Sequence, residues 1–204
     1  FALPNKKASY ELAHIVFYLS DYGQRAPQLP TTAIRSLSFA GILAYLDQDM
    51  DLLAEICAAL RFAGAAVPAL WEDAVQSAAR ACRIVPQQGG GPVDGYHAYL
   101  VTGWAAHMSG GAAFCQPVPQ GAVAIRYTPP NGALQALSAA LFEMGETRQA
   151  QWSLMRGRVM RALDPEAQEI LTEAETSCPQ FEAFFARFAR APIPAMPSAV
   201  QLRR

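Results

Sequence analysis

Residues 8–22, ASYELAHIVFYLSDY, decide the fold class because their apolar side chains recur at helical spacing. The apolar arc consists of Leu12, Ile15, Val16 and Leu19. Gly23 follows and provides a stop signal, since glycine readily adopts the backbone conformation that ends a helix. Phe17 falls on another side of the same helix. We therefore predict a helix that is buried on most of its sides.

The same helical pattern continues through most of the chain. It predicts further helices over residues 31–46, 49–62, 68–85, 93–108, 132–144, 147–163, 165–175 and 179–190. Most connections are short, so neighbouring helices are expected to be antiparallel. Residues 112–132 break the pattern with four prolines and an alternating stretch at 123–127, which predicts an irregular insertion with at most one short strand.

The expected fold is all-α, an array of antiparallel helical hairpins with one irregular, proline-rich insertion. An α-solenoid and part of an α/α toroid both fit helical pairs that recur along the chain. The 204 residues suit a single core better than two independent ones. We predict one helical domain over residues 1–190 and a proline-containing tail over residues 191–204.

Composition limits the possible partners and the compartment. The 16 basic and 17 acidic side chains nearly balance and form no dense basic run, which argues against binding to nucleic acid. No apolar run reaches the roughly 18 residues of a membrane span. The four cysteines are far apart and mostly have apolar neighbours, which favours buried thiols and a cytoplasmic location, although disulfides are not excluded. Since the first residue is Phe1, we expect further chain before it.

Two of the three histidines follow a carboxylate by three positions. These pairs are Glu11 with His14 and Asp94 with His97. Residues three apart on a helix project from the same side, so each pair is suited to hold a metal ion or to share a proton. The four side chains are therefore the predicted catalytic residues and the predicted metal ligands. Fe, Mn and Zn are the metals that imidazole and carboxylate groups suit.

Four other side chains are predicted to contact a substrate. Tyr18 and Asp21 share a narrow sector of their helix with Glu11 and His14. Trp104 heads an apolar stripe below the second pair, and Tyr96 projects toward other helices. An apolar wall below a few polar groups is typical of sites for small molecules.

The two motifs also carry a resemblance to a known group of proteins. The segments Glu11-Leu-Ala-His-Ile-Val-Phe-Tyr-Leu-Ser-Asp-Tyr-Gly23 and Asp94-Gly-Tyr-His-Ala-Tyr-Leu100 resemble an uncharacterised bacterial all-helical family. The resemblance covers these segments and the helices between them. It implies a domain that occurs in larger proteins, and it implies no established activity.

Two functions fit these features. The first is an enzyme in which both motifs converge and act on a small, partly apolar molecule by metal-assisted or acid/base chemistry. Two carboxylate-x-x-His motifs are half of the four-helix di-iron pattern, for which Glu55 and Glu143 are candidates by position, although nothing in the sequence selects them. The second is a non-catalytic helical-repeat module that binds a protein or peptide, for which the aromatic stripe at residues 181–188 offers a surface.

Each motif also has a purely structural interpretation. Asp94 stands at a predicted helix start, where a carboxylate caps the first amides. Glu11 and His14 form a plausible structural pair on the first helical turn, and Asp21 stands where the helix ends. The aromatic stripe is equally compatible with core packing.

Overall fold

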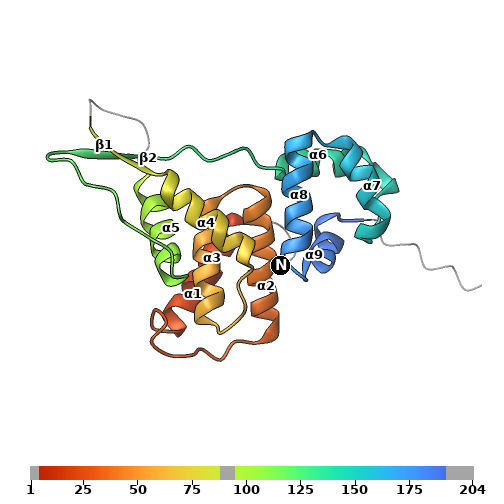
Figure 1. Ribbon diagram of the computed structural model, residues 1–204. Helices are drawn as coiled ribbons and strands as arrows, with labels where there is room; N and C mark the ends of the chain where they lie inside the picture. Colours follow the sequence, from red (N-terminus) through yellow and green to blue (C-terminus); the bar gives the residue numbers. More distant parts are fainter. Residues whose placement is uncertain (1–4, 88–94, 192–204) are drawn as a thin grey trace, which may run out of the picture.

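The computed structural model describes residues 5–87 and 95–191 (Figure 1). The predicted all-α class is confirmed, since the described residues form helices with one small sheet. The helices are α1 (Lys6–Leu19), α2 (Thr31–Leu46), α3 (Met50–Phe62), α4 (Ala69–Ala81), α5 (Tyr96–Met108), α6 (Leu134–Glu143), α7 (Trp152–Ala162), α8 (Pro165–Ser177) and α9 (Phe181–Phe188). In this part of the chain no helix has the length and apolar character that a membrane span requires. Asp94 and the predicted tail beyond residue 191 lie outside the described residues.

Helix α3 stands at the centre of the N-terminal half. Every residue from 52 to 60 is buried, because α1, α2, α4 and α5 all pack against this helix. A helix that is apolar on all sides belongs in such a position. The finer arrangement, a solenoid or an array of hairpins, stays a prediction, because contacts with α1, α2, α4 and α5 also fit a helix that lies between neighbouring hairpins.

Helix α2 joins the two halves of the molecule. Helices α6 to α9 lie together beside it (Figure 1), and α8 and α9 contact it directly. Tyr45 of α2 donates a hydrogen bond to Glu173 of α8 at 2.7 Å. The Phe39 and Phe184 rings meet edge to face, with centroids 6.0 Å apart. These contacts join the blue C-terminal helices to the core of the N-terminal half.

The aromatic stripe on α9 packs inside the molecule. Its first three phenylalanines, Phe181, Phe184 and Phe185, are buried, and Trp152 packs against Phe181 and Phe185. The core-packing interpretation of this stripe is therefore confirmed. These three rings are not available as a docking surface.

A short strand replaces the end of the predicted fourth helix. Helix α4 ends at Ala81 rather than continuing to residue 85, and β1 (Arg83–Pro86) pairs antiparallel with β2 (Val123–Arg126). The expected short strand in the insertion is thus confirmed as β2. The prediction for residues 83–85 was wrong because the β-branched pair Ile84 and Val85 finds its strand partner some 40 residues later, beyond any local pattern.

Helix α7 begins later than its pattern suggests. The predicted helix starts at residue 147, but residues Gly145–Thr147 form a 3₁₀ turn and α7 begins at Trp152. The start is fixed by α9, since Glu182 accepts a hydrogen bond from the Trp152 amide at 3.0 Å. A carboxylate at the first turn satisfies an otherwise unpaired donor of the helix.

Helix α1 is less enclosed than its apolar arc suggests. Its buried residues are Ser9, Ala13, Val16 and Phe17. Ile15 and Leu19, predicted on the buried side, are 52% and 49% exposed. The prediction was wrong because α1 is peripheral: it packs mainly on α3, and small residues on its contact face allow close approach. Ile15 and Leu19 therefore face outward, while Val16 is buried and Leu12 packs partly against the core.

The cysteines are all free, and Cys57, Cys82 and Cys178 are buried while Cys115 is exposed. Burial raises the pKa of each of the three enclosed thiols. The prediction of buried thiols is confirmed for these three. Cys115 is the most accessible of the four.

Gly41 allows the Trp71 ring to lie against the backbone of α2, which gives a stability test. A Cβ atom at Gly41 would lie 2.2 Å from a ring carbon of Trp71, and Trp71 is fully buried. We expect Gly41→Ala to lower the free energy of unfolding by about 1–3 kcal/mol, as overpacking does, in urea denaturation.

Gly157 provides the matched control, since it also lies within a helix but has only an arginine side-chain atom, 3.9 Å away, near its added Cβ. Gly157→Ala should raise the free energy of unfolding by about 0.5–1 kcal/mol through better helix propensity. Equal effects of the two substitutions would show that the contact with Trp71 does not constrain α2.

Candidate functional site

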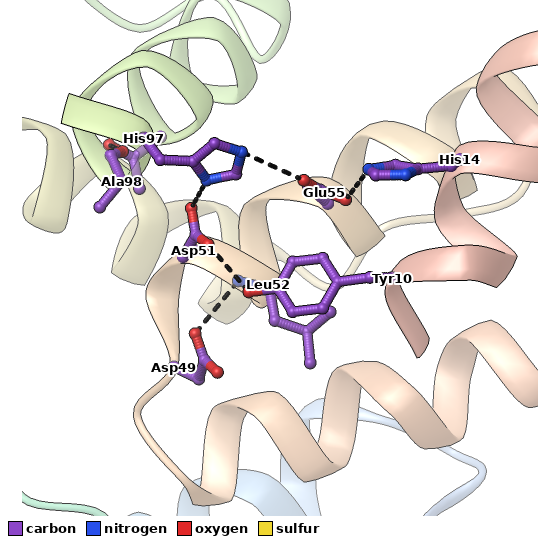
Figure 2. A network of polar contacts seen from close by, with 9 residues as sticks. Tyr10, His14, Asp49, Asp51, Leu52, Glu55, His97 and Ala98 are labelled. Carbon is purple, nitrogen blue, oxygen red and sulfur yellow. Dashed lines mark hydrogen bonds and ion pairs between the residues drawn. The ribbon is translucent and has the colours of Figure 1, made fainter. Parts of the chain in front are cut away.

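A network of polar side chains lies where α1 and α5 flank α3 (Figure 2). Asp51 and Glu55 are four residues apart on α3, so both project from the same side of that helix. The helix start is fixed by Asp49, whose side chain accepts a hydrogen bond from the Leu52 amide at 3.2 Å. This cap sets the direction in which the two following carboxylates point.

Glu55 is the buried centre of the network, with only 3% of its surface exposed. His14 of α1 places Nε2 3.0 Å from Oε2 of Glu55, and His97 of α5 places Nε2 4.0 Å from Oε1. Among the described residues, His14 is thus the nearest side-chain partner of Oε2. Burial raises the pKa of Glu55, while the adjacent imidazoles act in the opposite direction. The net shift is upward, so Glu55 retains a proton more readily than a carboxyl group in water.

Asp51 orients His97. Nδ1 of His97 lies 2.7 Å from Oδ1 of Asp51, and because a carboxylate only accepts, Nδ1 carries the proton. The other ring nitrogen, Nε2, then faces Glu55. Tyr10 of α1 donates a hydrogen bond to Oδ2 of Asp51 at 2.8 Å. Burial and the nearby carboxylates raise the pKa of Tyr10, so it stays a neutral donor.

The structure joins the two predicted histidines through Glu55 of α3. Among the described residues, His14 contacts Glu55, and His97 contacts Asp51 and Glu55, all on α3. Glu11 is exposed and forms an ion pair with Lys7 at 3.7 Å. Asp94 lies outside the described residues. The described network thus contains both predicted imidazoles, with carboxylates contributed by another helix.

The predicted substrate contacts lie around this network in different environments. Tyr96 is exposed and its ring lies edge to face with that of His97 at 6.3 Å. Trp104 is half-buried against Phe17 and Phe62. Tyr18 is exposed on α1, one turn after His14. Asp21 lies in the exposed turn after α1 with a positive φ of 50°, which fits the helix-ending role.

Sequence reasoning missed Asp51 and Tyr10 as members of the network. Glu55 was considered with Glu143 as a possible extra ligand, but Glu143 is exposed on α6. A signal for Glu55 was present: it is the one charged residue in LLAEICAAL, residues 52–60. A carboxylate inside an otherwise apolar helix needs partners from neighbouring elements.

The metal centre stays a prediction, because one of its four predicted ligands, Asp94, lies outside the described residues. Within the two described ranges, no group of three or more His, Cys, Asp or Glu side chains has the arrangement of a metal site. The network instead alternates carboxylates and imidazoles, with one carboxylate orienting an imidazole and another lying beneath its free nitrogen. Such pairs of titratable groups are suited to accept and release protons near neutral pH.

The raised pKa of Glu55 predicts how stability depends on pH. The folded state holds the carboxyl proton more tightly than the unfolded chain, whose carboxyl titrates near 4.5. The resulting stabilisation is complete below that pH and is lost as pH rises through the raised pKa. Glu55→Gln should therefore gain stability relative to wild type as pH rises, by about 1.4 kcal/mol for each pH unit between the two pKa values.

Urea denaturation between about pH 4 and pH 8 measures this difference. Glu11→Gln serves as the control because Glu11 is an exposed carboxylate on α1 that belongs to no buried contact, and its curve should follow that of wild type. Parallel curves for Glu55→Gln and wild type would contradict the raised pKa.

Comparison with known proteins places the chain in a family. Residues 1–191 match the family model described as Domain of unknown function (DUF6902). No curated protein and no solved structure matches the chain. The match agrees with the resemblance to an uncharacterised family and covers the whole network described above. The chain belongs to the DUF6902 family.

Proposed function

We propose that the network around Glu55 is the active site of an enzyme that transfers protons on a small, partly apolar molecule. The observation that carries this proposal is Glu55 itself, a buried carboxylate whose nearest charged or titratable partners among the described residues include the imidazoles of His14 and His97. Burial of such a group costs free energy. Carboxyl groups with shifted pKa values that pair with imidazoles are frequent at functional sites. There the free-energy cost of burial adjusts the group for proton transfer.

His97 acts as the general base in this proposal. Asp51 holds the Nδ1 proton, which leaves Nε2 as the atom that accepts a proton from the substrate. The imidazolium that forms is stabilised by Asp51 on one side and by Glu55 on the other. The His97 side chain is 53% exposed, so a substrate can reach it from the surface.

His14 supplies the complementary acid. Its Nε2 faces the second oxygen of Glu55 at 3.0 Å, and its side chain is 48% exposed. Glu55 thus lies beneath both imidazoles and couples their protonation: a proton gained at His97 favours loss of the proton at His14 through the shared carboxylate. Tyr10 and Asp51 position His97 without contacting the substrate.

The surroundings support a partly apolar substrate. Ile15 and Tyr18 on α1 and Tyr96 on α5 are exposed, and each is adjacent in sequence to one of the histidines or one helical turn from it. Exposed apolar groups next to polar ones are the usual composition of a small-molecule site. Metal-assisted chemistry with Fe, Mn or Zn stays a prediction, which elemental analysis of wild type and a His14→Ala, His97→Ala variant tests.

A second candidate function rests on a different observation. The outer face of α1 and the turn that follows it expose four large apolar side chains, Ile15, Tyr18, Leu19 and Tyr22. Contiguous exposed apolar groups are typical of protein-binding surfaces. A non-catalytic module would bind a protein or peptide through this face. The histidines would then only connect α1 and α5 to α3.

A generic base-catalysed reaction tests the enzyme proposal. In 5-nitrobenzisoxazole, abstraction of the ring C–H proton breaks the N–O bond and releases a coloured phenolate. We expect wild type to accelerate this reaction, and His97→Gln to lower kcat/KM by about 100-fold, the usual contribution of a general base. The wild-type rate should fall at low pH, where His97 becomes protonated, and this acidic limb should be missing in His97→Gln.

His107→Gln is the matched control, because His107 is an exposed histidine on the same helix that takes no part in the network. It should keep the wild-type rate and pH profile. If His97→Gln retained both as well, His97 would not be the base and the interaction module would become the preferred function.

A further inference from the structure

We infer that a second site, on another flank of α5, binds a small aromatic anion. A cavity of about 440 Å³ lies between the end of α4, the middle of α5 and residues 112–116. This volume falls within the range of small-molecule pockets. The side chains that matter for recognition are Arg80, Arg83, Tyr99, Phe114, Cys115 and Gln116. The proton-transfer network uses none of them.

Two guanidinium groups give the cavity its charge. Arg80 donates to the hydroxyl of Ser77 at 3.1 Å, and Arg83 donates to the carbonyl oxygens of Arg80 and Cys82. Neither arginine has a carboxylate partner among the described residues. Their partners orient both groups while leaving the positive charge uncompensated. Each guanidinium has five N–H donors, so several stay available for a carboxylate or phosphate oxygen.

Aromatic rings supply the apolar wall. The Phe114 and Tyr99 rings meet edge to face with centroids 5.4 Å apart, and Phe114 is 49% exposed. Gly103 makes this position possible, because a Cβ atom there would lie 2.5 Å from the Phe114 ring. The ring therefore lies against bare helix backbone. A flat ring of a ligand can stack beside it.

The backbone at the cavity is strained and held in place. Phe114 has a positive φ of 55°, a conformation that costs a non-glycine residue free energy and persists only where neighbours enforce it. Gln116 provides that restraint: its side chain donates to the carbonyl of Cys82 and accepts from the amide of Ile84 at 3.3 Å. Gln116 thus ties the segment that carries the Phe114 ring to Cys82 and to Ile84 of β1.

Charge and shape together define the ligand. Two guanidinium groups that have no carboxylate partner in the described part of the chain select an anion, and the Phe114 and Tyr99 rings select a planar apolar body. Benzoate and phenyl phosphate represent the carboxylate and phosphate forms of such a molecule. Benzamide has the same ring and no charge, and acetate has the charge and no ring.

Ligand-observed NMR measures binding of each compound to the full chain. We expect line broadening of benzoate or phenyl phosphate, and about tenfold weaker binding to an Arg80→Gln, Arg83→Gln variant, as loss of charge-assisted hydrogen bonds implies. Arg35→Gln, Arg161→Gln removes the same charge from exposed positions on α2 and α7 and should bind as wild type. Which anion binds more tightly identifies the acidic group.

Alkylation of Cys115 by iodoacetamide locates the bound anion. Cys115 lines the cavity and is exposed, whereas the other three thiols are buried. The anion that binds should slow this alkylation in wild type and leave it unchanged in the double arginine variant. The inference fails if neither anion binds, if benzamide or acetate binds as tightly, or if binding survives loss of both arginines.

Discussion

The enclosure of α3 by four other helices is the constraint on which the rest of this structure depends. A helix without a solvent-facing side has no place for an ionised side chain unless neighbours supply partners. Glu55 lies in the middle of that helix, and its partners come from α1 and α5. The positions of two peripheral helices and the protonation of one carboxyl group are therefore linked, because movement of either histidine removes a partner of Glu55.

Helix α5 lies close enough to contribute to this network because its buried side chains are small. Thr102, Gly103, Ala105 and Ala106 are its buried residues, so its backbone approaches α3 and α4 closely. Close approach brings His97 within 2.7 Å of Asp51. On another flank, the same lack of bulk at Gly103 admits the Phe114 ring. One helix thus positions functional side chains toward two different surfaces.

The helices could be predicted from the sequence because the residues that start and end a helix are local in the chain. Caps and stops at Asp49, Asp164 and Gly23 lie within a few residues of the segments they limit. The histidines and Glu55 were also identifiable as candidates, but Asp51 and Tyr10 were not. Tyr10 and Asp51 are 41 residues apart, and His97 and Asp51 are 46 apart. A helical pattern predicts on which face of its helix a residue lies, but it does not predict which other helix packs on that face. For the same reason Ile15 and Leu19 were wrongly assigned to the core.

The small sheet has a consequence for the order in which the molecule assembles. Strand β1 pairs with β2 across residues 87–122, and the amide of Gly95, just before α5, donates to Ile125 of β2 at 2.9 Å. The segment that carries His97, Tyr99 and Phe114 therefore forms a long loop, and contacts between residues distant in the chain hold its two ends together. Closing such a loop costs entropy before any contact is gained. Amide hydrogen exchange along this segment would thus report the assembly of both surfaces, separately from the helices around α2.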